Sequence, residues 1–179
     1  YMILSGTWDM SMINTPPLNR SPIRTFVMEE NPVTIKEAII REIERGGQVY
    51  FLHDAVHNIG KVAEQIQKLV PRVRIAVAHG QMNSRKLEMV MLDFIHQRLD
   101  ILVCTTIIES GIDIPNVNTI IINHAQRFGL ADLYQLRGRV GRSNVNAFAY
   151  LLYEKGKVFT DDALDRLSAI ADYSALGSG

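Results

Sequence analysis

Short apolar runs alternate along most of the chain with longer stretches in which apolar residues recur at every third or fourth position. The short runs predict β-strands, at residues 23–28, 49–52, 73–78, 100–104, 119–123 and 148–152. The periodic stretches predict α-helices, at residues 34–45, 58–69, 84–96, 130–137 and 161–173. Regular alternation of strand and helix is typical of parallel βαβ units. The pattern therefore predicts an α/β fold in which helices flank a parallel sheet.

The beginning of the chain does not follow this pattern. Three prolines, at positions 16, 17 and 22, fix φ and remove amide donors there. We expect residues 1–22 to be a linker or the remnant of a preceding domain, with at most a short strand at 2–4. The α/β domain is expected to occupy residues 23–156. Because the chain opens on Tyr1 and closes on Gly177-Ser178-Gly179, it is expected to be a piece of a longer protein.

Composition narrows the class of protein further. Hydrophobic residues make up 47% of the 179 positions, which excludes a disordered tail. Nineteen basic residues balance nineteen acidic ones, so any phosphate binding must come from local clustering of charge. The single cysteine, Cys104, cannot form an internal disulfide, which fits a reducing compartment, and we expect it to be buried and inert. No apolar run reaches the ~18–20 residues of a membrane span, so no membrane association is expected.

Polar and glycine residues follow several of the predicted strands. In an open α/β sheet, ligands lie outside the carboxyl ends of the strands, so these residues predict a functional edge. Polar loops are common without function, and the pattern gives a place rather than a chemistry. The residues are His53 and Asp54; His79, Gly80 and Gln81; Thr105 and Thr106, with Glu109, Gly111 and Asp113 beyond them; and His124.

The sharpest feature is residues 135–142, which read Gln-Leu-Arg-Gly-Arg-Val-Gly-Arg. Guanidinium groups fit phosphate oxygens, and glycines allow close approach of the backbone. Arg139 and Arg142 share a face if the preceding helix continues through them. The alternative is a solvated basic turn at a helix C-terminus. A Walker A loop, G-x-x-x-x-G-K-[ST], is absent from the sequence, so the chain resembles one half of a two-lobed NTPase.

Four motifs in order resemble those of superfamily 2 helicases and translocases. Residues 135–142 match the Q-x-x-G-R-x-G-R pattern of motif VI, and 105–115, Thr-Thr-Ile-Ile-Glu-Ser-Gly-Ile-Asp-Ile-Pro, resemble motif V. Residues 49–54 fall at motif IV, and 78–82 resemble motif IVa. Residues 105–115 and 128–138 together are most similar to the family of bacterial transcription-repair coupling factors, and less to RecG-type branched-DNA helicases.

The resemblance implies a RecA-like C-terminal motor lobe of an ATP-dependent double-stranded DNA translocase that displaces stalled RNA polymerase and couples transcription to repair. It implies a bacterial cytoplasmic protein. Residues 157–179 would begin a helical hairpin that couples ATP state to DNA movement. The implied partners are double-stranded DNA, the first RecA-like lobe of the parent chain, and, through other parent domains, RNA polymerase and excision-repair proteins. ATP with Mg²⁺ would be held mainly by the first lobe, so the isolated chain is expected to be inactive.

The resemblance also implies roles for single residues. Catalytic contacts to the ATP phosphates are expected from Arg139, Arg142 and Gln135. The nucleotide side is expected to include Gly111, Asp113 and Glu109. From its position in the motif V loop, Glu109 is either a general base or an ion-pair partner of a motif VI arginine, and the partner role is favoured. Contacts to DNA phosphates are expected from Thr105, Thr106, His79, Gly80 and Gln81.

Two alternative functions are compatible with the sequence, and several other features are assigned structural roles. A RecG-like lobe and a non-catalytic nucleic-acid binding module are the alternatives, whereas a dinucleotide enzyme lacks the G-x-G-x-x-G fingerprint. No metal site is predicted, because His53 and His57 are four apart without a third ligand, and surface or capping roles are expected for them. Glu42 is expected on an exposed helix face with Arg41 and Arg45.

Overall fold

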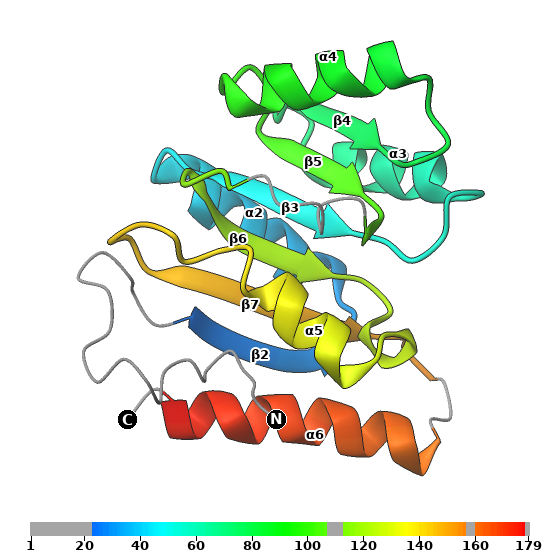
Figure 1. The fold of residues 1–179 in the computed structure, drawn as a ribbon, viewed down its shortest axis with the longest axis vertical. Coiled ribbons are helices and arrows are strands. Elements are labelled where there is room, and N and C mark those ends of the chain that lie inside the picture. Colours follow the sequence, from blue (N-terminus) through cyan, green and yellow to red (C-terminus); the bar gives the residue numbers. More distant parts are fainter. Residues whose placement is uncertain (1–22, 107–112, 157–159, 178–179) are drawn as a thin grey trace.

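The computed structural model describes residues 23–106, 113–156 and 160–177. Its centre is a six-stranded sheet in which every strand pairs in parallel with its neighbours, in the order β2-β7-β6-β3-β5-β4 (Figure 1). The strands are β2 (Ile23–Glu29), β3 (Gln48–Leu52), β4 (Ile75–Ala78), β5 (Ile101–Cys104), β6 (Val117–Ile122) and β7 (Ala147–Tyr153). The predicted α/β fold with a parallel sheet is confirmed.

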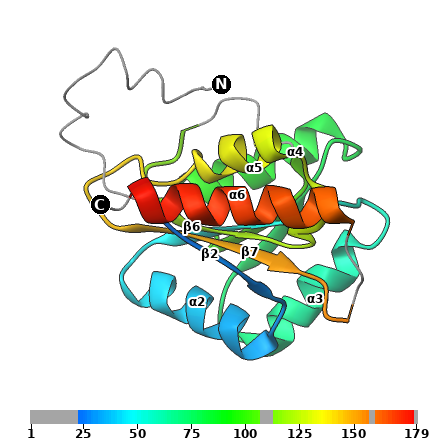
Figure 2. The same ribbon diagram turned by 90° about the horizontal axis from the view of Figure 1, so that it is seen from below.

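Helices cover both faces of the sheet (Figure 2). One face carries α2 (Pro32–Glu44) and α3 (Ile59–Leu69), and the other carries α4 (Ser84–Ile95), α5 (Leu130–Arg137) and α6 (Asp161–Gly177). The short 3-10 helix η2 (Ala125–Arg127), which the sequence did not predict, follows β6. Among the helices in the described part of the chain, none combines the length and apolar content needed to cross a bilayer.

Two apolar cores result from this arrangement, one on each side of the sheet. Along β3, Tyr50 and Leu52 face the core under α4, α5 and α6, whereas Val49 and Phe51 face the core over α2 and α3. All residues of β3, β5 and β6 are buried, which explains why their sequences are almost continuously apolar. Cys104 lies in this buried region, as expected, and burial raises the pKa of its thiol.

Element bounds differ from the predicted ones by at most four residues, and those of α5 agree at both ends. The first helix begins at Pro32 because the Asn31 side chain accepts a hydrogen bond from the Val33 amide, at 2.9 Å. The last helix extends to Gly177. The expected linker and short strand within residues 1–22 lie outside the described residues.

The expectation that Glu42 is exposed was wrong. Its side chain is only 1% exposed, and its carboxylate accepts two hydrogen bonds from Arg45, each of 2.7 Å, and one from the Thr119 hydroxyl. A buried carboxylate requires such partners, because desolvation without them costs several kcal/mol. Glu42 therefore joins α2 to the middle of the sheet.

Candidate functional site

Residues 138–142, which we call the arginine segment, follow the end of α5 and do not continue the helix. The helix ends at Arg137, and Gly138 occupies the C-cap. The chain then turns, with the Arg139 amide donating to the Leu136 carbonyl at 3.0 Å and the Val140 amide donating to the Arg137 carbonyl at 3.3 Å. Arg139 and Arg142 are therefore not placed on one helical face, and their positions depend on this turn.

Gly141 fixes the geometry between the two arginines. Its φ is +80°, a region that L side chains rarely adopt, and a Cβ there would lie 3.0 Å from Ile23 Cγ1 of the neighbouring strand β2. Val140, beside it, is buried in the core. The backbone of this segment is thus packed closely against the sheet, while Arg139 and Arg142 remain only partly buried.

Arg142 lies beside Asp113, as its Nε is 3.8 Å from the Asp113 Oδ1. The Arg142 side chain is 31% exposed and that of Asp113 is 58% exposed, so solvent reaches the pair. The Arg142 Nε atom itself is buried and has no hydrogen-bond acceptor among the residues that the structure describes. An anionic group placed beside Asp113 could accept a hydrogen bond from this atom.

Tyr50 connects Arg139 to the same region. Burial raises the pKa of the Tyr50 phenol, the nearby Cys104 and Asp113 raise it further, and the Arg139 guanidinium opposes them. Arg139 and Asp113 thus both lie within electrostatic range of one side chain of β3. These residues gather on the α4 and α5 face of the sheet, towards the starts of β6 and β7.

The predicted DNA-contacting residues lie at the opposite ends of the strands. His79, Gly80 and Gln81 follow β4, and Thr105 and Thr106 follow β5, the neighbouring strand. The Thr105 amide approaches the Ala78 carbonyl at 3.4 Å, so the two segments adjoin. Gly80, Gln81 and Thr106 are exposed, and a Cβ on Gly80 would meet nothing within 4 Å.

The structure therefore separates the predicted site residues into two groups. Asp113 precedes β6, so it lies at the amino end of that strand and not at the carboxyl edge where the polar pattern placed it. Gln135 is on an exposed position of α5. Glu109 and Gly111 lie outside the described residues.

Sequence reasoning missed the buried side-chain amide of Asn118, which contacts the arginine segment. Asn118 is 3% exposed, donates to the Pro115 carbonyl at 3.2 Å and accepts from the Ser143 hydroxyl at 3.4 Å. Ser143 directly follows Arg142, and Pro115 is two residues beyond Asp113. Asn118 thus connects the segment that carries Asp113 to the segment that carries Arg142. In the sequence, the one local sign of this role was a polar residue near the start of a predicted strand.

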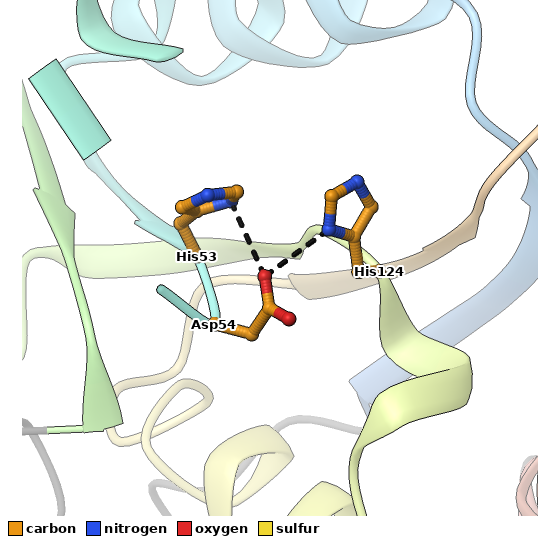
Figure 3. Close-up of side chains that lie close together, drawn as sticks. All are labelled: His53, Asp54 and His124. Atoms are coloured by element: carbon orange, nitrogen blue, oxygen red, sulfur yellow. Dashed lines mark hydrogen bonds and ion pairs between the residues drawn. The ribbon is translucent and has the colours of Figure 1, made fainter. Parts of the chain in front are cut away.

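A second polar cluster, His53, Asp54 and His124, lies where β3 and β6 end (Figure 3). The expectation of a surface position for His53 was wrong, because the residue is 1% exposed. It does contact the helix cap residue, since its Nε2 is 2.7 Å from the Asn58 Oδ1. Burial alone would raise the pKa of Asp54, but hydrogen bonds and charge from Arg127 and His124 outweigh it and hold that pKa below its usual value.

A six-stranded parallel sheet with helices on both faces is the architecture of a RecA-like helicase C-terminal lobe. Residues 31–144 match the family model described as "Helicase conserved C-terminal domain", and the chain belongs to that family. Its fold and motifs are those expected from the sequence.

Within this family the chain is similar to transcription-repair-coupling factors. It is 57% identical over 178 residues to that of Escherichia coli (strain K12), covering 99% of this chain and 16% of the relative. It is 54% identical over 179 residues to that of Staphylococcus aureus (strain USA300), covering 100% of this chain and 15% of the relative. The chain thus spans about one sixth of the length of these relatives.

Two solved structures show the same architecture. A structure of RecG bound to a three-way DNA junction has a TM-score of 0.73 and 30% identity, covering 96% of this chain and 25% of that one. The S. cerevisiae protein Dbp5 bound to RNA and ADP BeF3 has a TM-score of 0.64 at 16% identity, covering 97% of this chain and 48% of that one. The second likeness concerns the fold alone.

Proposed function

We propose that this chain is the second motor lobe of an ATP-dependent double-stranded DNA translocase that couples transcription to DNA repair. The similarity to transcription-repair-coupling factors over essentially the whole chain supports this assignment. RNA polymerase displacement and contacts with excision-repair proteins would then belong to other parts of the parent protein. The first RecA-like lobe of that parent would hold ATP and its Mg²⁺.

The observation that carries the catalytic part of the proposal is the placement of Arg142 beside Asp113, with Arg139 on the same face. The buried Nε donor of Arg142, which meets no acceptor in the described residues, fits a phosphate oxygen. In this proposal Arg139 and Arg142 stabilise the charge that develops on the transferred phosphoryl group. Asp113 orients Arg142, and Gln135, exposed on α5, hydrogen-bonds within the same interlobe cleft.

The DNA-side residues have the chemistry of sequence-independent binding. The exposed Thr106 hydroxyl and Gln81 amide, and the backbone of Gly80, present groups that hydrogen-bond to phosphates without reading bases. The zero net charge of the chain is compatible with this role, because contact is confined to one edge. These residues serve a motor that moves over any sequence.

The test uses the full-length parent protein. Arg139→Ala and Arg142→Ala should each lower DNA-stimulated ATP turnover by a factor of ~10³–10⁵ while nucleotide binding survives, because an arginine of this kind acts on the transition state. Arg98→Ala is the control, since Arg98 is an exposed arginine beyond the C-cap of α4 that pairs with Asp93 at 3.1 Å. Turnover that is indifferent to both Arg139 and Arg142 would refute the catalytic assignment and favour a binding module.

A RecG-like lobe is the second candidate, favoured by the structural likeness to RecG on a three-way junction. The two candidates differ in the activity of the parent protein. Displacement of a stalled RNA polymerase without unwinding of branched DNA supports the coupling-factor assignment, and the reverse result supports the RecG-like one. The purified chain alone should hydrolyse no ATP in either case.

A further inference from the structure

The side chains of His53, Asp54 and His124 converge on one point at the carboxyl edge of the sheet (Figure 3). The Asp54 Oδ1 atom lies 3.1 Å from His124 Nδ1 and 3.7 Å from His53 Nδ1. One donor atom from each residue lies within 4.8 Å of the others. In a tetrahedral zinc site with ligands about 2.0–2.1 Å from the ion, donor atoms are roughly 3.4 Å apart. The distances from Asp54 Oδ1 to the two imidazole nitrogens, 3.1 Å and 3.7 Å, lie on either side of this value.

The contacts behind each imidazole orient its Nδ1 atom into the cluster. His53 Nε2 is 2.7 Å from Asn58 Oδ1, which only accepts hydrogen bonds, so the His53 proton sits on Nε2. The Nδ1 lone pair then accepts from the Asn123 amide at 3.0 Å, with Asp54 Oδ1 beside it at 3.7 Å. His124 Nε2 lies 3.9 Å from the Glu154 carboxylate. An acceptor behind the imidazole is the arrangement that metal-ligating histidines use to set ring orientation and tautomer.

Arg127 orients the carboxylate in the same way. Its Nη1 atom donates to Asp54 Oδ2 at 2.8 Å, and its Nη2 atom donates to Glu154 at 2.6 Å. The other oxygen, Oδ1, is the one that faces the two imidazoles. With both histidines neutral, the two carboxylates and one guanidinium sum to a charge of minus one, which favours an added cation.

Asn123 offers a fourth ligand. Its Nδ2 atom donates to His53 Nδ1 at 3.0 Å, a contact that a metal ion would replace. Rotation of the amide by half a turn places Oδ1 where Nδ2 now lies, at a distance suitable for a shared ion. The proton that His124 Nδ1 shares with Asp54 would move to Nε2, towards Glu154. The hydrogen bonds of His53 with Asn58 and of Asp54 with Arg127 would persist through these changes and hold two of the ligands in place before an ion arrives.

We propose that His53, Asp54 and His124, completed by Asn123, form a site for a divalent transition-metal ion of the Zn²⁺ type. Two imidazole nitrogens favour Zn²⁺, Co²⁺ or Ni²⁺ over Mg²⁺ and Ca²⁺, which prefer oxygen ligands. The ion would join the end of β3 to the residues between β6 and η2. This site is separate from the arginine segment, so the proposal does not depend on the proposed motor function.

The test is a titration of the chelator-treated chain with Co²⁺, followed by absorption, and with Zn²⁺, followed by calorimetry. We expect one ion per chain and a rise in the melting temperature. His124→Gln and Asp54→Asn should each weaken binding by roughly tenfold or more, and His124→Cys, which restores a zinc ligand, should recover part of it. His124 and Asp54 are each partly exposed, so these variants avoid the fully buried His53.

His57→Gln and His96→Gln are the matched controls, because both histidines are exposed. They should bind Co²⁺ as the unchanged chain does. Absence of Co²⁺ and Zn²⁺ binding at micromolar concentrations would overturn the proposal, as would binding that His124→Gln and Asp54→Asn leave unchanged. Binding that is lost in His57→Gln or His96→Gln would assign the ion to a surface histidine and overturn it equally. Circular dichroism confirms that each variant is folded before its titration is interpreted.

Discussion

Gly47, between α2 and β3, should be intolerant of a single added methyl group. A Cβ at this position would lie 1.9 Å from Glu42 Oε2 and 2.7 Å from Glu42 Cδ. Contacts this short do not occur, so the buried carboxylate of Glu42 would have to leave its place. It would then lose its two hydrogen bonds from Arg45 and the one from Thr119.

The magnitude follows from these lost contacts. Hydrogen bonds to charged groups contribute about 1.5–3 kcal/mol each, and breaking a buried ion pair costs about 3–5 kcal/mol in all. Replacing glycine with alanine also lowers the conformational entropy of the unfolded chain. This effect stabilises the folded state by about 0.4–1 kcal/mol and offsets part of the loss. Gly47→Ala should therefore lower the free energy of unfolding by about 2–4 kcal/mol, or the melting temperature by roughly 4–16 °C for a domain of this size.

Urea denaturation followed by circular dichroism measures this change. Gly60→Ala is the matched control, because Gly60 lies in the first turn of α3 and a Cβ there meets nothing within 4 Å. Alanine is the better helix former, so Gly60→Ala should be neutral or slightly stabilising. In a Glu42→Ala background, where the carboxylate is gone, Gly47→Ala should cost little. A Gly47→Ala protein as stable as Gly60→Ala, or a cost that persists without Glu42, would refute the reasoning.

Three further results are expected. Asn118→Ala should lower the free energy of unfolding by about 1–3 kcal/mol, because it leaves the Pro115 carbonyl and the Ser143 hydroxyl without this partner, whereas exposed Asn144→Ala should not. Burial acts to raise the pKa of Asp100, but the Arg74 guanidinium and amide hold it below its usual value of about 3.9. Asp100→Asn should therefore be destabilising at neutral pH, with the difference from the unchanged chain shrinking below about pH 4; equal unfolding curves at pH 7 would contradict this. Cys104 should react with a thiol reagent only after unfolding, since it is fully buried in β5, and rapid labelling of the folded chain would contradict that position.

The order of elements along the chain was predictable, because local periodicity reports burial. All six strands and five helices of the described structure were expected, although η2 was not. The order of strands across the sheet was not predictable in the same way. Nothing local indicates that β7 lies between β2 and β6, since the pairing of β7 with β2 joins residues more than a hundred positions apart, such as Ile23 and Ala147.

Glu42 shows how periodicity can be overridden by residue type. Position 42 follows the buried residues Ala38 and Ile39 by four and three residues, so helical spacing places it on the same buried face. Its charge suggested the opposite. The buried position is stable only because Thr119, from a strand 77 residues away, meets the carboxylate, and no helix-based argument could supply that partner.

The candidate site was predictable as a set of motifs but not as an arrangement. In a parallel α/β unit the chain leaves the carboxyl end of one strand and must return to the amino end of the next. Helix α5 makes this return between β6 and β7, so the arginines that follow it arrive near the start of β7. Asp113 lies near the start of β6 because the segment after β5 makes the same return. The Nε atom of Arg142 and the Oδ1 atom of Asp113 are therefore only 3.8 Å apart. His53 and His124 instead follow the ends of adjacent strands and remain at the carboxyl edge, which is why the sheet brings them together although 71 positions separate them in the sequence.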